Sequence, residues 1–232
     1  MTAAASGVRL VVFDMAGTTV RDDALVLNCF VEAAQRVGLD VSREELNARM
    51  GESKRAVFDA LARRQRAPEV AARGYETFRA VLEEAYARAG AAPIDGAERV
   101  FARLRADGVR VALNTGFYRR VADLLVERLG WRDVVDAVVC DDDVPEGRPA
   151  PYMIHAAMQR CGVHDVRDVA VVGDTPSDML AGRNAGARAV VGVTSGSHTA
   201  ASLRRYPATH VVESVRDIPA VLAALAVCEL TP

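Results

Sequence analysis

The chain has 232 residues, of which 50% are hydrophobic and 26% charged, a balance typical of a globular protein with a substantial core. Its formal net charge of −2 provides no basic field for nucleic acid or for an acidic membrane surface. No apolar run approaches the ~20 residues of a membrane-spanning helix, and residues 1–7 contain no signal-peptide core, so we expect a cytoplasmic protein that binds neither nucleic acid nor a membrane.

The first predicted element is a buried strand that ends at an aspartate. An apolar run rich in β-branched residues precedes Asp14, and this pattern is typical of a strand in a parallel sheet. After Asp14 the chain turns through Ala16, Gly17 and Thr18. A carboxylate at the carboxyl end of such a strand lies where open α/β sheets bind ligands. Taken alone, Asp14 is equally well explained as a solvated turn residue.

The next stretch, residues 22–92, shows helical patterns alone and is predicted to form an all-helical insert. Four helices are expected there: the first from Leu25 to a stop at Gly38, the second between Ser42 and Met50, the third from residues 51–53 to Ala67, and the fourth over residues 68–89. Short linkers at residues 21–23 and 91–93 connect this insert to the rest of the chain.

From residue 94 onward, strands alternate with helices. Strands are predicted at residues 109–113, 137–140, 169–172, 188–193 and 210–212, and helices at residues 96–107, 118–129, 151–161 and 179–184. This alternation indicates a doubly wound parallel sheet. The predicted fold is therefore α/β, with a Rossmann-like core of residues 1–21 and 93–232 and an inserted all-helical cap domain of residues 22–92.

Polar residues follow three of the later predicted strands. Thr115 and Gly116 follow the second strand, Arg148 lies in the loop after the third, and Asp174 and Asp178 follow the fourth. Each has an ordinary alternative, because Thr115 and Asp178 could cap helices and Arg148 could be a surface cation. Four polar strand ends in this order, that of Asp14 included, nevertheless favour a common site.

The residue types at these strand ends suit phosphoryl chemistry. The Asp14 carboxylate can attack phosphorus and form an aspartyl-phosphate. The amides of the turn at Gly17 and Thr18, the Thr115 hydroxyl and the Arg148 guanidinium can hold phosphate oxygens. Carboxylate oxygens, which the fourth strand end supplies, suit Mg²⁺. The sequence therefore predicts a magnesium-assisted phosphoryl site.

The four segments resemble the motifs of the haloacid dehalogenase superfamily. Its first motif, DxDxT, is similar to residues 14–18; its second corresponds to Thr115; its third, usually Lys, to Arg148; and its fourth, GDxxxD, to residues 173–178. The helical insert matches the position of the superfamily's cap. The resemblance implies that Asp14 is the nucleophile and that Mg²⁺ is held by Asp14, Asp174, the Ala16 carbonyl and Asp178. It also implies that Thr115, Gly116 and Arg148 hold the phosphoryl group.

The first motif departs from the superfamily's pattern at Ala16, where phosphatases carry a second aspartate that protonates the leaving alkoxide. The segment Asp14–Thr19 is similar to that of phosphonatases (phosphonoacetaldehyde hydrolases), which cleave a C–P bond. In that family a cap lysine in a Met-Gly-x-x-Lys segment forms an imine, or Schiff base, with the substrate aldehyde. Here the matching segment is residues 50–54, so the resemblance implies that Lys54 forms the imine and that Met50 and Gly51 shape its pocket.

Lys54 is the single lysine among 29 basic residues. A lone lysine is either an accident of composition or the mark of a position where arginine would fail, because arginine stays protonated and is not an amine nucleophile. Its place at the start of a helix, with partial burial, is expected to lower its pKa, which Glu52 opposes. The alternative is a solvated surface lysine.

Three functions remain open from the sequence. Phosphonatases carry His, Tyr and Cys where this chain has Val57, Phe117 and Ala24, so these proton carriers are missing. The first function is C–P hydrolysis of a small carbonyl phosphonate through Lys54. The second is phosphomonoester hydrolysis with Lys54 as a cationic anchor, and the third is non-catalytic binding of a phosphorylated ligand. The resemblance also implies a homodimer that forms through the cap.

Overall fold

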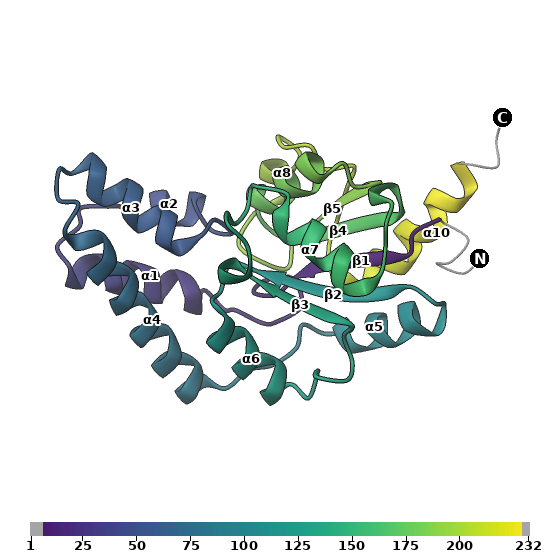
Figure 1. Cartoon of the computed structure of the whole chain (residues 1–232), viewed down its shortest axis with the longest axis horizontal. Coiled ribbons are helices and arrows are strands. Elements are labelled where there is room, and N and C mark those ends of the chain that lie inside the picture. Colours follow the sequence, from purple (N-terminus) through teal and green to yellow (C-terminus); the bar gives the residue numbers. More distant parts are fainter. Residues whose placement is uncertain (1–6, 229–232) are drawn as a thin grey trace.

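The computed structural model describes residues 7–228 and shows a twisted sheet beside a separate group of helices (Figure 1). Six parallel strands form the sheet in the order β3-β2-β1-β4-β5-β6. Their bounds are β1 Leu10–Asp14, β2 Arg110–Thr115, β3 Ala137–Cys140, β4 Val169–Gly173, β5 Ala189–Val193 and β6 His210–Val212. The predicted α/β fold with a Rossmann-like, doubly wound parallel sheet is confirmed.

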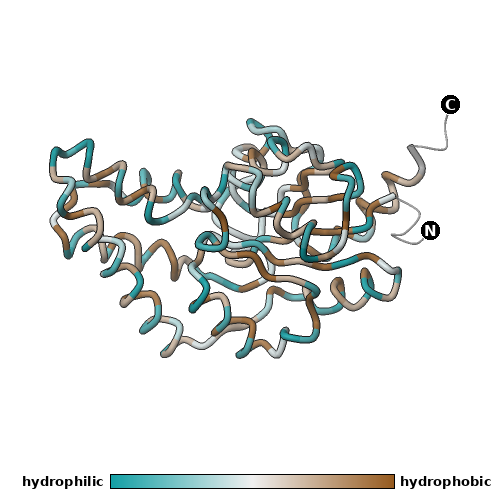
Figure 2. Tube along the Cα trace, viewed as in Figure 1, coloured by the Kyte–Doolittle hydropathy of each residue, from teal (hydrophilic) through white to brown (hydrophobic). Residues whose placement is uncertain are grey.

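The central strands are hydrophobic on both faces because helices cover both. On one face Phe13 packs edge-on against Phe101 of α5 (Ala97–Ala106), with 5.4 Å between ring centroids. On the other face Leu10 and Val12 join a cluster with Ile154 of α7 (Tyr152–Cys161). The hydropathy colouring shows the apolar character of the strands (Figure 2). A parallel sheet buried on both faces requires such continuous apolar runs.

The position of β1 places its carboxyl end at the centre of the sheet. It pairs with β2 on one side and with β4 on the other, with Asp14 opposite Asn114. The strand order therefore reverses at β1, and a crevice opens outside the carboxyl ends of strands at such a point. This topology places Asp14 at the position in the sheet where a ligand site is expected.

Four helices lie between β1 and α5 and form their own small core (Figure 1). They are α1 (Leu25–Arg36), α2 (Arg43–Ala48), α3 (Lys54–Arg64) and α4 (Val70–Ala89). The fully buried rings of Phe30, Phe58 and Phe78 pack together, with centroids 5.1 Å apart for Phe30 and Phe58. Ser42 and Ser53 cap α2 and α3, as expected for helices that follow a serine.

The chain crosses between the sheet and the four helices twice, and the crossings are neighbours. Arg21 donates a backbone hydrogen bond to the Ala92 carbonyl at 2.9 Å, and Ile94 donates one to the Thr19 carbonyl at 2.8 Å. The adjacent crossings are what an inserted segment needs. The division into two domains at residues 22 and 92 stays a prediction.

Four further helices lie in the rest of the described chain: α6 (Arg119–Arg128), α8 (Pro176–Ala185), α9 (Ala200–Leu203) and α10 (Ile218–Cys228). The sequence patterns predicted the first two of these and not the last two. Helix α8 begins at Pro176, three residues before the predicted start, because Thr175 caps it. Helix α10 is almost entirely apolar, so it lacks the periodicity that reveals a helix. Within residues 7–228 no helix is long and apolar enough to cross a membrane.

Replacement of Phe58 tests the packing of the four helices. Phe58→Ala removes a fully buried ring that contacts two others, and it is expected to lower the free energy of unfolding by about 3–5 kcal/mol. Urea unfolding followed by circular dichroism measures the change. As a control, Tyr152→Ala alters an exposed ring and should change stability by less than about 0.5 kcal/mol. A Phe58→Ala loss no larger than this control would contradict the packing.

Candidate active site

The carboxyl ends of the strands and the start of α3 surround one cavity of about 550 Å³. Ten of the predicted site residues line it: Asp14, Ala16, Gly17, Met50, Gly51, Lys54, Thr115, Gly116, Arg148 and Asp174. The other two predicted residues, Thr18 and Asp178, lie just behind the lining and contact members of it. The tertiary structure thus brings residues from four strand ends and one helix of the insert into one place.

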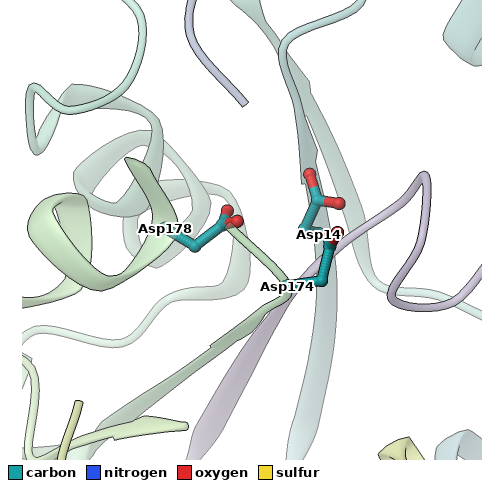
Figure 3. A group of neighbouring side chains, drawn as sticks. All are labelled: Asp14, Asp174 and Asp178. Carbon is teal, nitrogen blue, oxygen red and sulfur yellow. The ribbon is translucent and has the colours of Figure 1, made fainter. Parts of the chain in front are cut away.

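Three buried carboxyl groups cluster at the base of the cavity, two of them in its lining and that of Asp178 just behind it. Oxygens of Asp14, Asp174 and Asp178 lie within 4.8 Å of one another, and each residue is at most 4% exposed. Asp14 and Asp174 follow neighbouring strands, and Asp178 projects toward them from α8 (Figure 3). Burial and the two neighbouring carboxylates raise the pKa of Asp14, and burial together with Asp178 raises the pKa of Asp174 to about 6.

Arg148 is buried among these carboxylates and is not a surface cation. Its Nη1 lies 2.7 Å from Asp14 Oδ1 and also donates to Asp178 Oδ1. Its coulombic attraction opposes the upward pKa shifts of Asp14 and Asp174 without cancelling them. One guanidinium among three carboxylates leaves an excess of negative charge that a divalent cation would neutralise. The donors are hard oxygens, which fit Mg²⁺.

Hydroxyl and amide groups orient the two carboxylates that follow β4. Asp174 Oδ2 accepts bonds from the Ser197 backbone nitrogen at 2.7 Å and from its hydroxyl at 2.9 Å, and Oδ1 accepts one from Thr18 at 3.2 Å. Asp178 Oδ2 accepts a 2.6 Å bond from the Thr175 hydroxyl. Asp178 therefore has both roles: Oδ2 takes part in the capping box at the start of α8, and Oδ1 accepts a hydrogen bond from Arg148.

The turn after Asp14 passes close to Asp174. Gly17 has a φ of +87°, and a Cβ there would lie 2.7 Å from Asp174 Oδ2. Only glycine fits both conditions. The turn is also held by Ser195, whose hydroxyl donates to the Gly17 carbonyl at 2.8 Å.

Ser195 and Ser197 were not predicted as site residues. They lie in the loop after β5, and both line the cavity. The available signal was weak: they follow a buried strand as polar residues, like the predicted groups, but they match no motif.

Thr115 and Gly116 line the cavity at the end of β2, the strand that pairs with β1 beside Asp14. Thr115 is 2% exposed, and its hydroxyl oxygen accepts a 3.1 Å bond from the Phe117 backbone nitrogen. This bond orders the turn and leaves the hydroxyl proton free to be donated to a ligand. Gly116 approaches the helical insert closely, since a Cβ there would lie 3.3 Å from the Glu52 carbonyl oxygen.

Lys54 faces this cavity from the first position of α3. It is only 4% exposed, its Nζ donates to the Glu52 carbonyl at 3.1 Å, and the Nζ lies 5.3 Å from the centroid of the Phe30 ring. Burial and then the positive charge of Arg148 lower its pKa to about 8, against opposing effects of Glu52, Asp141 and Asp14. The alternative of a solvated surface lysine is wrong.

The three positions that lack the expected proton carriers differ in where they lie relative to the cavity. Val57 is fully buried in the helical core, whereas Phe117 and Ala24 line the cavity. The hydroxyl of the next tyrosine, Tyr118, donates to Glu83 at 2.7 Å, and Tyr118 is absent from the cavity lining. Asp22, which was not predicted, does line the cavity, and one of its oxygens accepts a bond from the Val26 backbone at 3.1 Å.

A family model and a sequence relative both match most of this chain. A sequence model of the haloacid dehalogenase-like hydrolases matches residues 8–186. The chain is 33% identical over 207 residues to phosphonoacetaldehyde hydrolase of Bacillus cereus, an alignment that covers 82% of this chain and 77% of the relative.

Two solved structures share the fold. A phosphonoacetaldehyde hydrolase-like protein from Oleispira antarctica has a TM-score of 0.83 at 23% identity, covering 95% of this chain and 93% of the other. A structure described as a predicted phosphoglycolate phosphatase from Haemophilus somnus 129pt has a TM-score of 0.73 at 18% identity, covering 93% and 98%. At these identities the similarity concerns the fold alone.

Magnesium should stabilise the folded chain through the acidic cluster. At 100 times its dissociation constant a ligand adds about 2.7 kcal/mol, which for a chain of this size raises the melting temperature by roughly 5–10 °C. Differential scanning calorimetry with MgCl₂ and then with EDTA measures the shift. Asp174→Asn should lose most of it, whereas Asp165→Asn, which alters an exposed carboxylate paired with Arg167, should keep it. Equal shifts in both variants would contradict a metal site at Asp174.

Proposed function

This chain belongs to the haloacid dehalogenase superfamily, as a hydrolase of phosphorus compounds, and we propose that it hydrolyses the C–P bond of a small carbonyl phosphonate of the phosphonoacetaldehyde type. The observation that carries the proposal is the buried Lys54, whose amine shares a cavity with Asp14 and has a lowered pKa. Ala16 supports it, because a methyl group cannot protonate an alkoxide and the leaving group must be stabilised in another way.

In the first step Lys54 forms a covalent imine with the substrate. Its neutral amine attacks the carbonyl carbon, and the resulting carbinolamine takes up a proton from solvent and loses water to give a protonated imine. With a pKa of about 8, roughly one-tenth of Lys54 is neutral at pH 7, a far larger share than at the ordinary value of 10.5. The protonated imine then serves as an electron sink beside the C–P bond.

In the second step Asp14 displaces the carbon from phosphorus. Its carboxylate oxygen bonds to phosphorus, the C–P bond breaks, and the bonding electrons move onto the imine to give an enamine. Arg148 and Thr115, which both line the cavity, would hold phosphoryl oxygens during this transfer. When bound by Asp14, Asp174, the Ala16 carbonyl and Asp178, Mg²⁺ supplies positive charge that offsets the charge of the phosphoryl group.

The last steps release both products. The enamine carbon takes up a proton, and water hydrolyses the imine to free the carbonyl product and Lys54. A second water cleaves the aspartyl-phosphate and gives inorganic phosphate and Asp14. The sum consumes one water, because the water lost on imine formation is returned on its hydrolysis.

A second candidate is phosphomonoester hydrolysis by the same Asp14. It is favoured by the absence of the phosphonatase proton carriers at Val57, Phe117 and Ala24. Lys54 would then be a cationic anchor, so its replacement by arginine would be tolerated in part. The third reading, a non-catalytic ligand-binding relative, would show neither activity.

Three wider expectations accompany the proposal. We infer that the four helices of residues 22–92 act as a cap over the core, that two copies pair through this cap, and that the protein acts in the cytoplasm. Light scattering on the purified chain tests the pairing, and a monomer at micromolar concentration would contradict it.

Borohydride trapping tests the imine directly. Incubation with phosphonoacetaldehyde, reduction and peptide mass mapping should give a stable adduct on Lys54, and unreduced samples should release phosphate. Lys54→Arg should form no adduct at residue 54 and lose at least about 10³-fold in kcat/KM, because guanidinium is no amine nucleophile.

Asp14→Asn separates the two chemical steps. It should still form the Lys54 adduct but release no phosphate, since it keeps the amine and removes the nucleophile. Label on the N-terminal amine alone would contradict the imine, and a screen of phosphate esters would then test the second candidate.

The pH profile provides an independent check on Lys54. Because the neutral amine is the nucleophile, kcat/KM should rise with pH and level off above about 8, the value to which burial and Arg148 lower the pKa. An ordinary lysine would keep the rate rising toward 10.5. Steady-state phosphate release between pH 6 and 10 measures the profile, and a rate that still rises steeply at pH 10 would contradict a buried amine.

A further inference from the structure

The segment that precedes Lys54 packs on the core more tightly than a flexible lid would. A Cβ on Gly51, whose φ is +85°, would lie 2.2 Å from Thr175 Oγ1, in the loop after β4. The carbonyl oxygens of Gly51 and Glu52 approach Gly116, in the loop after β2. Residues 51 and 52 therefore pack closely against two strand-end loops of the core, with no room for a Cβ at Gly51 and little at Gly116.

Ser53 makes the polar part of this contact with a third loop. Its hydroxyl donates to Asp141 Oδ2 at 2.6 Å, and Asp141 directly follows β3. The same Ser53 oxygen caps α3 by accepting from the Ala56 nitrogen at 3.5 Å. A single hydroxyl thus ties the start of α3 to the core, one residue before Lys54.

The Asp141 side chain is closely confined. A Cβ on Gly147 would lie 1.9 Å from Asp141 Oδ1, and within residues 7–228 this buried oxygen accepts no hydrogen bond. The Asp141 backbone nitrogen donates to the Phe117 carbonyl at 3.1 Å. A confined carboxylate with one short bond to Ser53 is a rigid anchor, and bonds to an ionised acceptor are stronger than neutral ones.

We propose that Ser53 and Asp141 are positioning residues, whose hydrogen bond docks the start of α3 on the core and holds the Lys54 amine in the cavity that contains Asp14. Its meaning for catalysis rests on the proposed function, because positioning matters most if Lys54 forms the imine. The docking itself is a property of the free protein and can be measured without turnover.

The pKa of Lys54 depends on contact between α3 and the core, because most of the charged groups near its amine belong to the core. The charged groups that act on it are Arg148, Asp141 and Asp14 from the core, Glu52 beside it, and Asp22 at the crossing to α1. Burial and Arg148 lower its pKa, and the carboxylates raise it. If α3 moves away from the core, Lys54 gains water and leaves Arg148, so its pKa should rise toward 10.5.

The single lysine makes the experiment unusually direct. Protein labelled with [¹³C]lysine gives one lysine side-chain signal, and its Cε shift against pH reports the ionisation of Lys54. The wild-type midpoint is expected near 8. In Ser53→Ala, which breaks the docking bond without changing charge, the midpoint should move upward. Each unit of rise lowers the neutral fraction at pH 7 about tenfold.

Three comparison variants separate docking from other effects. Ser53→Thr keeps the hydroxyl and should restore the wild-type midpoint. Asp141→Asn keeps an acceptor for Ser53 but removes a negative charge, so its midpoint should lie at or below the wild-type value. Ser42→Ala removes the cap of the neighbouring helix α2, where Ser42 accepts from the Glu45 nitrogen at 3.1 Å, and should leave Lys54 unchanged.

The outcomes distinguish this inference from the proposed function. A Ser53→Ala midpoint equal to that of wild type, or an equal rise in Ser42→Ala, would overturn the positioning role. If Ser53→Ala shifts the midpoint while the borohydride test finds no adduct on Lys54, docking stands and the proposed reaction fails. If both tests succeed, kcat/KM at pH 7 should fall in Ser53→Ala in proportion to the lost neutral amine.

Discussion

The site depends on the repulsion among three carboxyl groups that are buried within 4.8 Å of one another. The strand order reverses at β1, and the carboxyl ends of the neighbouring parallel strands lie at the same edge of the sheet. The polar groups at these strand ends therefore lie close together. Burial removes the water that would screen their charge, and this cost appears as the raised pKa values of Asp14 and Asp174. The surrounding hydrogen bonds from Ser197, Thr18 and Thr175 orient the carboxylates but add no charge.

Two cationic side chains, Arg148 and Lys54, lie near these carboxylates and differ in their bonds and in their protonation. Arg148 bonds to Asp14 and Asp178 and stays protonated, because guanidinium holds its proton and the carboxylates favour the charged form. Lys54 lies beside Arg148 without a carboxylate bonded to its amine among the described residues, and burial favours its neutral form. The first can bind phosphoryl oxygens, and the second can act as a nucleophile. Replacement of Lys54 by arginine would remove the nucleophile, because guanidinium is not an amine nucleophile.

The contribution of the helical insert is therefore chemical as well as steric. Its core of three phenylalanines supports α1, α3 and α4, and Phe30 of that core lies under the Lys54 amine. The same helices bury Val57, an apolar side chain with no proton to donate, at a position where phosphonatases carry a histidine. With a methyl group at Ala16 as well, the cavity offers an amine where a phosphatase of this superfamily would offer an acid. These two features are the basis of the proposal that the leaving group is stabilised as an enamine.

The sequence by itself determined the parallel sheet and the four helices inserted after its first strand, and it predicted ten of the residues that line the cavity. Buried strands and amphipathic helices leave local periodicities, and motif residues recur at strand ends, so Asp14, Thr115 and Asp174 could be predicted from the sequence. Lys54 could be predicted from the match of residues 50–54 to a Met-Gly-x-x-Lys segment. Helix α10 could not, because its uniformly apolar sequence has no period. Only the tertiary structure decided that Arg148 is buried, that Ser197 holds Asp174, and that Asp141 meets Ser53 across 88 positions of sequence. Such contacts depend on which loops meet in space, so no local pattern records them. The helix start predicted a lowered pKa for Lys54, but only the tertiary structure supplied its near-complete burial and the neighbouring charge of Arg148.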